Sequence, residues 1–218
     1  MSHRSIIALA AVSLIPQFPR FAFSSDSATR LELTLLVYNY TALSSGQIAE
    51  IRARVAFIIE HAGMRTNWLD CRPIPQNHPV PAPCQQPLGP SNLAIRLLDQ
   101  TTASKTGSLI TPLAHYIASE TGGSYANVFC PTVRQFARGN RTSELAYLGH
   151  TIAHEIGHLL LGPGAHSNEG IMRARWDKSE LRRIAEAQLG LLFPKEQAER
   201  LRMCLSARQK SAQDSTIK

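Results

Sequence analysis

The hydrophobic positions along this chain follow two different periods, which predict an alternation of strands and helices. Residues 31–40 begin with alternating apolar and polar positions and continue with β-branched and aromatic residues, as a strand does. A helix of about eighteen residues is expected next, opened by Ser44 or Ser45, running to His61 and ended by Gly63. Its buried face combines the apolar positions that recur at helical spacing, Ile48, Ile51, Val55, Ile58 and Ile59.

The same pattern predicts three further strands and, near the C-terminus, two further helices. Residues 65–71 predict a second strand, and the resulting strand–helix–strand unit implies a right-handed crossover with parallel pairing. Residues 92–98 predict a third strand, and residues 124–129 a fourth that is short enough to lie at the edge of the sheet. The C-terminal helices are expected at 178–189 and 194–206.

A second long helix is predicted at 143–161, and it carries the residues with the clearest chemistry. Thr142 or Ser143 can cap its start, and Gly162 and the following Pro163 end it. Its buried stripe consists of apolar residues at spacings of three and four, namely Leu145, Leu148, Ile152, Ile156 and Leu159. The helix therefore buries one face and presents its polar residues on another.

His154, Glu155 and His158 form the pattern HExxH within this helix. Positions i and i+4 lie on one face, about 6 Å apart along the axis, so both imidazoles can reach one metal ion. Neutral imidazole is a good zinc ligand, and a catalytic zinc site keeps one position open for water. Glu155 lies beside the first His, where it can accept a proton from that water.

The residues after the second His extend the pattern toward a known family. Gly162, His166 and the run Gly170-Ile171-Met172 follow, and the whole set resembles the metzincin metalloproteases. Their motif is HExxHxxGxxH followed by a methionine turn, and here the loop between the second and third His is two residues longer. The Tyr that some metzincins carry two residues after the turn Met is Ala174 in this chain.

This resemblance implies a zinc-dependent endopeptidase that acts on a peptide or protein substrate. It implies an α+β fold with a mixed twisted sheet, two long helices and a small helical C-terminal subdomain. A substrate peptide would add to the edge strand at 124–129. The implied roles are zinc ligands for His154, His158 and His166, general base for Glu155, and structural support for Gly162 and Met172.

Other assignments of these residues stay open. Glu169 is a local rival for the third ligand, and Glu180, 22 residues after His158, fits the spacing of gluzincin-like zinc peptidases. His150 lies two helical turns from His158, about 12 Å along the axis, so we expect an outer or solvent-facing position rather than ligation. A non-catalytic exported zinc-binding protein is the last alternative, although structural sites commonly use Cys and none lies between 131 and 203.

The N-terminus is typical of a secretory signal. Arg4 precedes an apolar run at 6–15, and Ala22-Phe23-Ser24 offers small residues for cleavage after Ser24. This run is shorter than the roughly 20 residues of a membrane helix, so we expect a secreted or periplasmic protein, with an uncleaved anchor as the alternative. The expected parts are a signal peptide at 1–24, a catalytic subdomain at 25–166, a helical subdomain at 167–208 and a flexible tail at 209–218.

The cysteines and the charge refine this interpretation. Cys71 and Cys84 enclose a proline-rich segment, and in an exported protein they can form a disulfide, whereas the pairing of Cys130 and Cys204 stays open. The formal net charge is +7, but no dense Lys/Arg run is interleaved with aromatic residues. Nucleic-acid binding is therefore not expected, and we predict a monomer.

Overall fold

The fold is described by a computed structural model, which covers most of the chain after residue 30. The residues described are 31–71, 79–105, 114–119, 122–140, 142–185 and 190–216. The predicted signal peptide at 1–24 lies outside them, as does the part of the proline-rich segment at 72–78. Within these ranges, no helix has both the length and the apolar character needed to cross a membrane.

A five-stranded mixed sheet with the order β2-β1-β3-β5-β4 stands at the centre of the molecule. The parallel strands are β1 (Glu32–Tyr40), β2 (Arg65–Asp70), β3 (Asn92–Leu98) and β5 (Gly122–Phe129). β4 (Ala114–Ser119) pairs antiparallel with β5. A mixed sheet with separate helices agrees with the predicted α+β class. β1 and β2, which are joined through the helix at 45–61, have the parallel pairing expected from the sequence.

The prediction of an edge strand at 124–129 is wrong. These residues belong to β5, which lies between β3 and β4. The edge beyond β5 is formed by β4, which pairs antiparallel with β5, and the opposite edge is formed by β2. Two short helices were also not predicted, α2 (Gln100–Lys105) and α3 (Cys130–Gly139).

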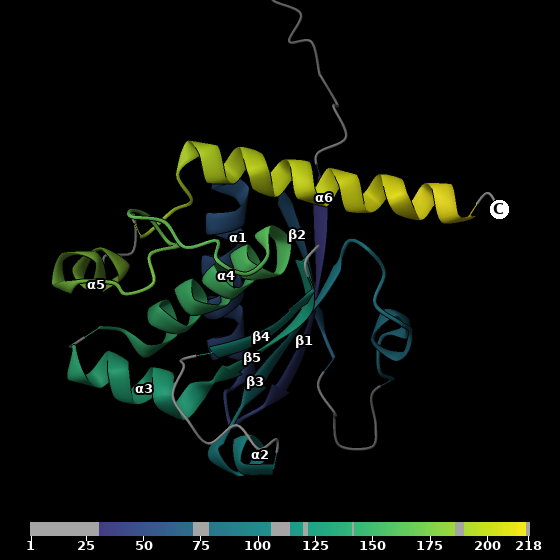
Figure 1. Cartoon of the computed structure of the whole chain (residues 1–218). Helices are drawn as coiled ribbons and strands as arrows, with labels where there is room; N and C mark the ends of the chain where they lie inside the picture. Colours follow the sequence, from purple (N-terminus) through teal and green to yellow (C-terminus); the bar gives the residue numbers. More distant parts are fainter. Residues whose placement is uncertain are drawn as a thin grey trace, which may run out of the picture.

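Two long helices, α1 (Ser45–His61) and α4 (Glu144–Leu161), pack on the same side of the sheet (Figure 1). α1 begins with a capping box, in which the Ser44 hydroxyl accepts from the Gln47 N–H and the Gln47 side chain accepts from the Ser44 N–H. At Gly149 an added Cβ would lie 2.8 Å from Arg54 Cγ, so the two helices approach too closely there for a side chain. The apolar faces of both helices and of β1, β3 and β5 form one core.

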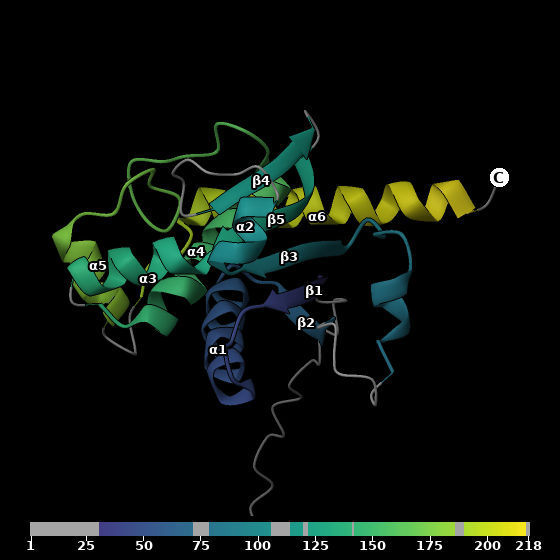
Figure 2. The same cartoon turned by 90° about the horizontal axis from the view of Figure 1, so that it is seen from below.

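The C-terminal part contains α5 (Lys178–Ala185) and α6 (Lys195–Thr216). α6 crosses the molecule and projects beyond the sheet (Figures 1 and 2). It runs well past the predicted end at 206, and the expected flexible tail at 209–218 is helical as far as Thr216. Residues 207–213 contain no Gly or Pro and several good helix formers, so the local sequence gives the helix no reason to stop.

Two arginines of α6 donate hydrogen bonds to backbone carbonyls at the C-terminal ends of the long helices. Arg202 Nη1 donates to the Ala62 carbonyl at the end of α1, at 2.7 Å. Arg208 donates to the Leu159 carbonyl in the last turn of α4. Cationic donors suit these positions, because the last carbonyls of a helix lack partners and carry its negative dipole end. α6 therefore holds the C-terminal end of the helix that carries HExxH.

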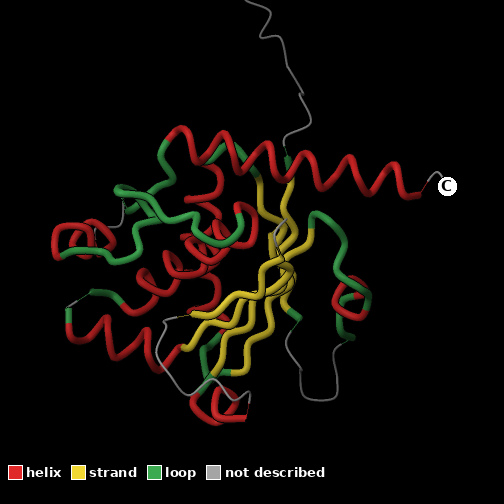
Figure 3. Tube along the Cα trace, in the orientation of Figure 1, coloured by secondary structure: helices red, strands yellow, loops and turns green. Residues whose placement is uncertain are grey.

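The predicted disulfide between Cys71 and Cys84 is confirmed. It joins the end of β2 to a short 3-10 helix, η1 (Ala82–Gln85), on the side of the sheet opposite the long helices (Figure 3). The Tyr38 hydroxyl of β1 donates to the Cys84 carbonyl at 3.2 Å, which ties this segment to the sheet. Cys130 is buried, Cys204 is half-buried, and both are free thiols.

Candidate metal centre

Local sequence signals set both ends of α4. The Ser143 hydroxyl accepts a hydrogen bond from the Ala146 N–H at 3.4 Å, and Glu144 lies in the first turn, near the positive end of the helix dipole. Gly162 follows the last helical residue with φ of 86°, in the left-handed region that glycine adopts without strain. The chain turns there, and four positions later it reaches His166.

Three imidazole rings meet beside the C-terminal half of α4. His158 Nε2 lies 3.1 Å from His154 Nε2 and 3.1 Å from His166 Nε2. The candidate ligand atoms of the three residues all lie within 4.8 Å of one another. Exposure increases from His158, which is buried, through His154, which is half-buried, to His166, which is exposed. The group could hold a metal ion that is reached from solvent on the His166 side.

The geometry of these rings fits a metal with imidazole ligands. Two nitrogens on a tetrahedral zinc, each bonded at about 2.0–2.1 Å, lie about 3.3 Å apart. The observed separation of 3.1 Å from His158 Nε2 to each neighbour is close to this value, and the ligand atoms of His154 and His166 lie within 4.8 Å of each other. His154 Nδ1 donates to the Ile171 carbonyl at 2.7 Å, and because a carbonyl only accepts, the ring proton is on Nδ1. The Nε2 lone pair of His154 is therefore free to bind a metal.

Burial also favours the neutral imidazoles that metals require. It lowers the pKa of His154 to about 4, against an opposing effect of the Ile171 carbonyl. The pKa of His158 is also lowered to about 4, first by burial and then by its two histidine neighbours. Both rings are consequently neutral near pH 7, so metal binding does not have to displace the second proton of an imidazolium.

Met172 lies against the backbone of α4 within the HExxH segment. Its side chain is fully buried, and a Cβ added at Gly157 would overlap its sulfur. The same Cβ would lie 3.0 Å from Phe193 Cε1. The absence of a side chain at Gly157 thus allows Met172 to pack directly beneath the turn that carries His154 and His158.

Glu155 is buried next to the first histidine in the sequence. It is 6% exposed, and its Oε2 has no hydrogen-bond partner among the described residues. Burial raises the pKa of this carboxyl to about 8. A carboxyl with a raised pKa can both accept and release a proton near neutral pH, which is what general acid–base catalysis needs.

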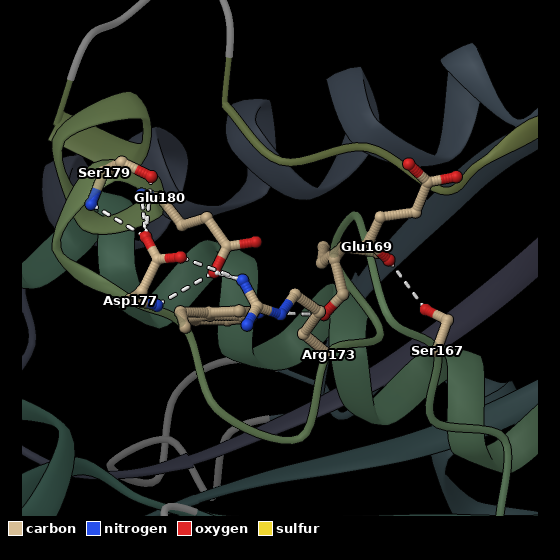
Figure 4. A network of polar contacts seen from close by, with 8 residues as sticks. Ser167, Glu169, Arg173, Asp177, Ser179 and Glu180 are labelled. Atoms are coloured by element: carbon tan, nitrogen blue, oxygen red, sulfur yellow. Dashed lines mark hydrogen bonds and ion pairs between the residues drawn. The ribbon is translucent and has the colours of Figure 1, made fainter.

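The two rival carboxylates are outside the histidine cluster. Glu180 accepts from Arg173 Nη1 and from the Asp177 N–H, both at 2.8 Å, and is buried in this network (Figure 4). Glu169 contributes its backbone carbonyl, which accepts from the Ser167 hydroxyl at 2.7 Å. Neither belongs to the group of possible metal ligands found in the described part of the chain.

His150 is not among the grouped ligands of the described residues, and of the two positions expected for it the solvent-facing one is wrong. It is fully buried, and its Nδ1 donates to the Ala146 carbonyl at 2.8 Å. Its Nε2 accepts from the Leu191 N–H at 3.1 Å. Burial lowers its pKa to about 4. His150 thus joins α4 to the segment that leads into α6, a role that helical spacing alone did not indicate.

Two residues that support the cluster escaped sequence analysis. Trp176 Nε1 donates to the Ile171 carbonyl at 3.1 Å, and Gln197 Nε2 donates to the Ala165 carbonyl at 3.1 Å. Neither lies in a motif or at a periodic position relative to the histidines, so no sequence signal could have found them.

Comparisons with known proteins add no family here, because no family model and no curated protein matches this chain.

Proposed function

We propose that this protein is an exported zinc-dependent endopeptidase of the metzincin type. The observation that carries the proposal is the meeting of three Nε2 atoms, with 3.1 Å from the central His158 to each of the other two. Three protein ligands with an open fourth position are typical of catalytic zinc, whereas structural zinc has four. The order of the motif also supports the proposal: HExxH comes first, the third histidine follows, and Met172 then packs against α4.

In this proposal, His154, His158 and His166 hold the metal. Bound zinc would lower the pKa of a water ligand and polarise the scissile carbonyl. Glu155 accepts a proton from the attacking water at its carboxylate and delivers it to the leaving amine. The lack of a hydrogen-bond partner at Glu155 Oε2 supports this role, because no donor among the described residues occupies the lone pair that would take the proton.

The substrate is proposed to be an extended peptide that adds to β4. This strand is one of the two edge strands of the described sheet, and it lies against α4. A free edge offers backbone groups to an incoming strand, and side-chain pockets then provide specificity. The corrected sheet order therefore moves the expected docking strand from 124–129 to β4.

The Cys71–Cys84 disulfide supports the exported location, since disulfides persist in oxidising compartments.

The decisive experiment compares the wild type with Glu155→Gln for bound zinc and for hydrolysis of casein. This substitution keeps the size of the side chain and removes its ability to accept a proton. We expect both proteins to bind one zinc ion and only the wild type to cleave, with activity lost by orders of magnitude in the variant. Zinc binding without hydrolysis in the wild type would instead identify a non-catalytic zinc-binding protein.

A further inference from the structure

The carbonyl of Ile171 accepts two hydrogen bonds from side chains at the candidate metal centre. His154 Nδ1 donates to it at 2.7 Å, and Trp176 Nε1 donates to it at 3.1 Å. A backbone carbonyl has two lone pairs, so both bonds can form together. The Trp176 indole therefore contacts the Ile171 carbonyl oxygen, which is the same oxygen that sets the tautomer of His154.

The indole ring also packs edge-on against α4 beside that ligand. Its centroid lies 5.8 Å from the His154 ring with an interplanar angle of 83°. Similar edge contacts follow along the helix, to Tyr147 at 5.3 Å and 79° and to His150 at 6.3 Å and 81°. Trp176 is half-buried, and its ring lies in direct contact with the ring of His154.

We propose that Trp176 is a positioning residue for the metal ligand His154. It holds the Ile171 carbonyl in place and limits rotation of the imidazole, so that Nε2 stays directed at the other two histidines. Loss of such an outer partner typically lowers metal affinity by about 10–100-fold. The inference rests on the proposed metal site but not on peptidase activity.

The chain contains a matched control in its other tryptophan. Trp68 lies in β2 and packs against the core, and its Nε1 is buried with no hydrogen-bond partner in the described residues. The substitutions Trp176→Phe and Trp68→Phe thus make the same chemical change. Only the first removes an N–H that is hydrogen-bonded to the Ile171 carbonyl.

The main experiment measures zinc affinity by chelator competition for the wild type and both variants. We expect Trp176→Phe to weaken zinc binding about tenfold or more, and Trp68→Phe to leave it unchanged. The visible spectrum of the Co²⁺-loaded protein should change in the first variant alone, because it reports ligand orientation. Wild-type affinity and an unchanged Co²⁺ spectrum in Trp176→Phe would overturn the proposal.

A double-mutant cycle separates positioning from general support of the fold. If Trp176 acts through His154, adding Trp176→Phe to the His154→Ala variant should not lower zinc affinity further. Adding Trp176→Phe to the His166→Ala variant should still lower it. An equal loss of zinc affinity in both backgrounds would contradict the inference.

In Trp68→Phe the only remaining indole is that of Trp176, and its fluorescence should be quenched by Co²⁺. An unaffected emission would also overturn the inference. Tight zinc binding without casein hydrolysis would refute the proposed enzyme and leave this inference standing.

Discussion

Gln197 Nε2 donates a hydrogen bond of 3.1 Å to the carbonyl of Ala165, the residue directly before His166. Gln197 lies in the first turn of α6 and is 7% exposed. The loop that carries the third candidate ligand is therefore fastened to the C-terminal helix. This contact provides a physical reason why a loop two residues longer than the metzincin pattern still brings His166 to the other two histidines.

Removing this contact should loosen the third ligand. Gln197→Ala leaves the Ala165 carbonyl without its donor, and such a loss costs about 1–3 kcal/mol when the group is buried. We expect weaker zinc binding in chelator competition. The control is Gln209→Ala in the same helix, because Gln209 donates to the Glu32 carbonyl and not to the loop that carries His166. Equal zinc affinity in both variants would show that α6 does not position His166.

The sequence was most informative where structure is set by local interactions. The long helices were predicted nearly to their ends, because the Ser44 and Ser143 caps and the Gly162 turn are local signals. The i, i+4 histidines followed from helix geometry alone.

The missed features depend on contacts between distant segments. β4 lies at one edge of the sheet through its antiparallel pairing with β5. Trp176 and Gln197 reach carbonyls of other segments, which no local pattern records. The buried position of His150 likewise arises from its contact with Leu191.

The identity of the third ligand can be tested with three variants. His166→Ala should lose most of its zinc affinity, because it removes one of the three meeting Nε2 atoms. Glu169→Ala and Glu180→Ala should bind zinc as the wild type does. Glu180→Ala should nevertheless be less stable to urea, since Arg173 and the Asp177 N–H lose an acceptor. Loss of zinc in Glu180→Ala would replace the metzincin assignment with the gluzincin-like one.

His150 should make the metal-free protein sensitive to acid. Burial lowers its pKa from 6.5 to about 4, so below pH 6.5 the unfolded chain binds a proton that the folded chain excludes. Folding stability should fall as the pH drops from 6.5 and level off below 4, by up to about 3 kcal/mol for this group.

Urea unfolding from pH 7 to pH 4, with chelator present, measures this contribution. His150→Gln cannot titrate and should lose less stability over the range, although it starts from a lower value because the contacts with Ala146 and Leu191 change. The other histidines titrate in both proteins and cancel in the comparison. Parallel pH profiles for the two proteins would exclude His150 as the source.

Gly157 should tolerate no side chain, because Met172 occupies the space that a Cβ would need. Gly157→Ala forces Met172 or Phe193 to move, and such overpacking of a core costs about 1–3 kcal/mol. Gly139→Ala in α3 is the matched control, since an added Cβ there meets nothing within 4 Å. The control should be neutral or stabilising by up to about 1 kcal/mol, the helix propensity difference between the two residues. Urea denaturation of both variants provides the comparison. Equal free energies of unfolding for Gly157→Ala and Gly139→Ala would mean that Met172 can move away from α4 at no cost. Met172 would then have no part in supporting the turn that carries His154 and His158.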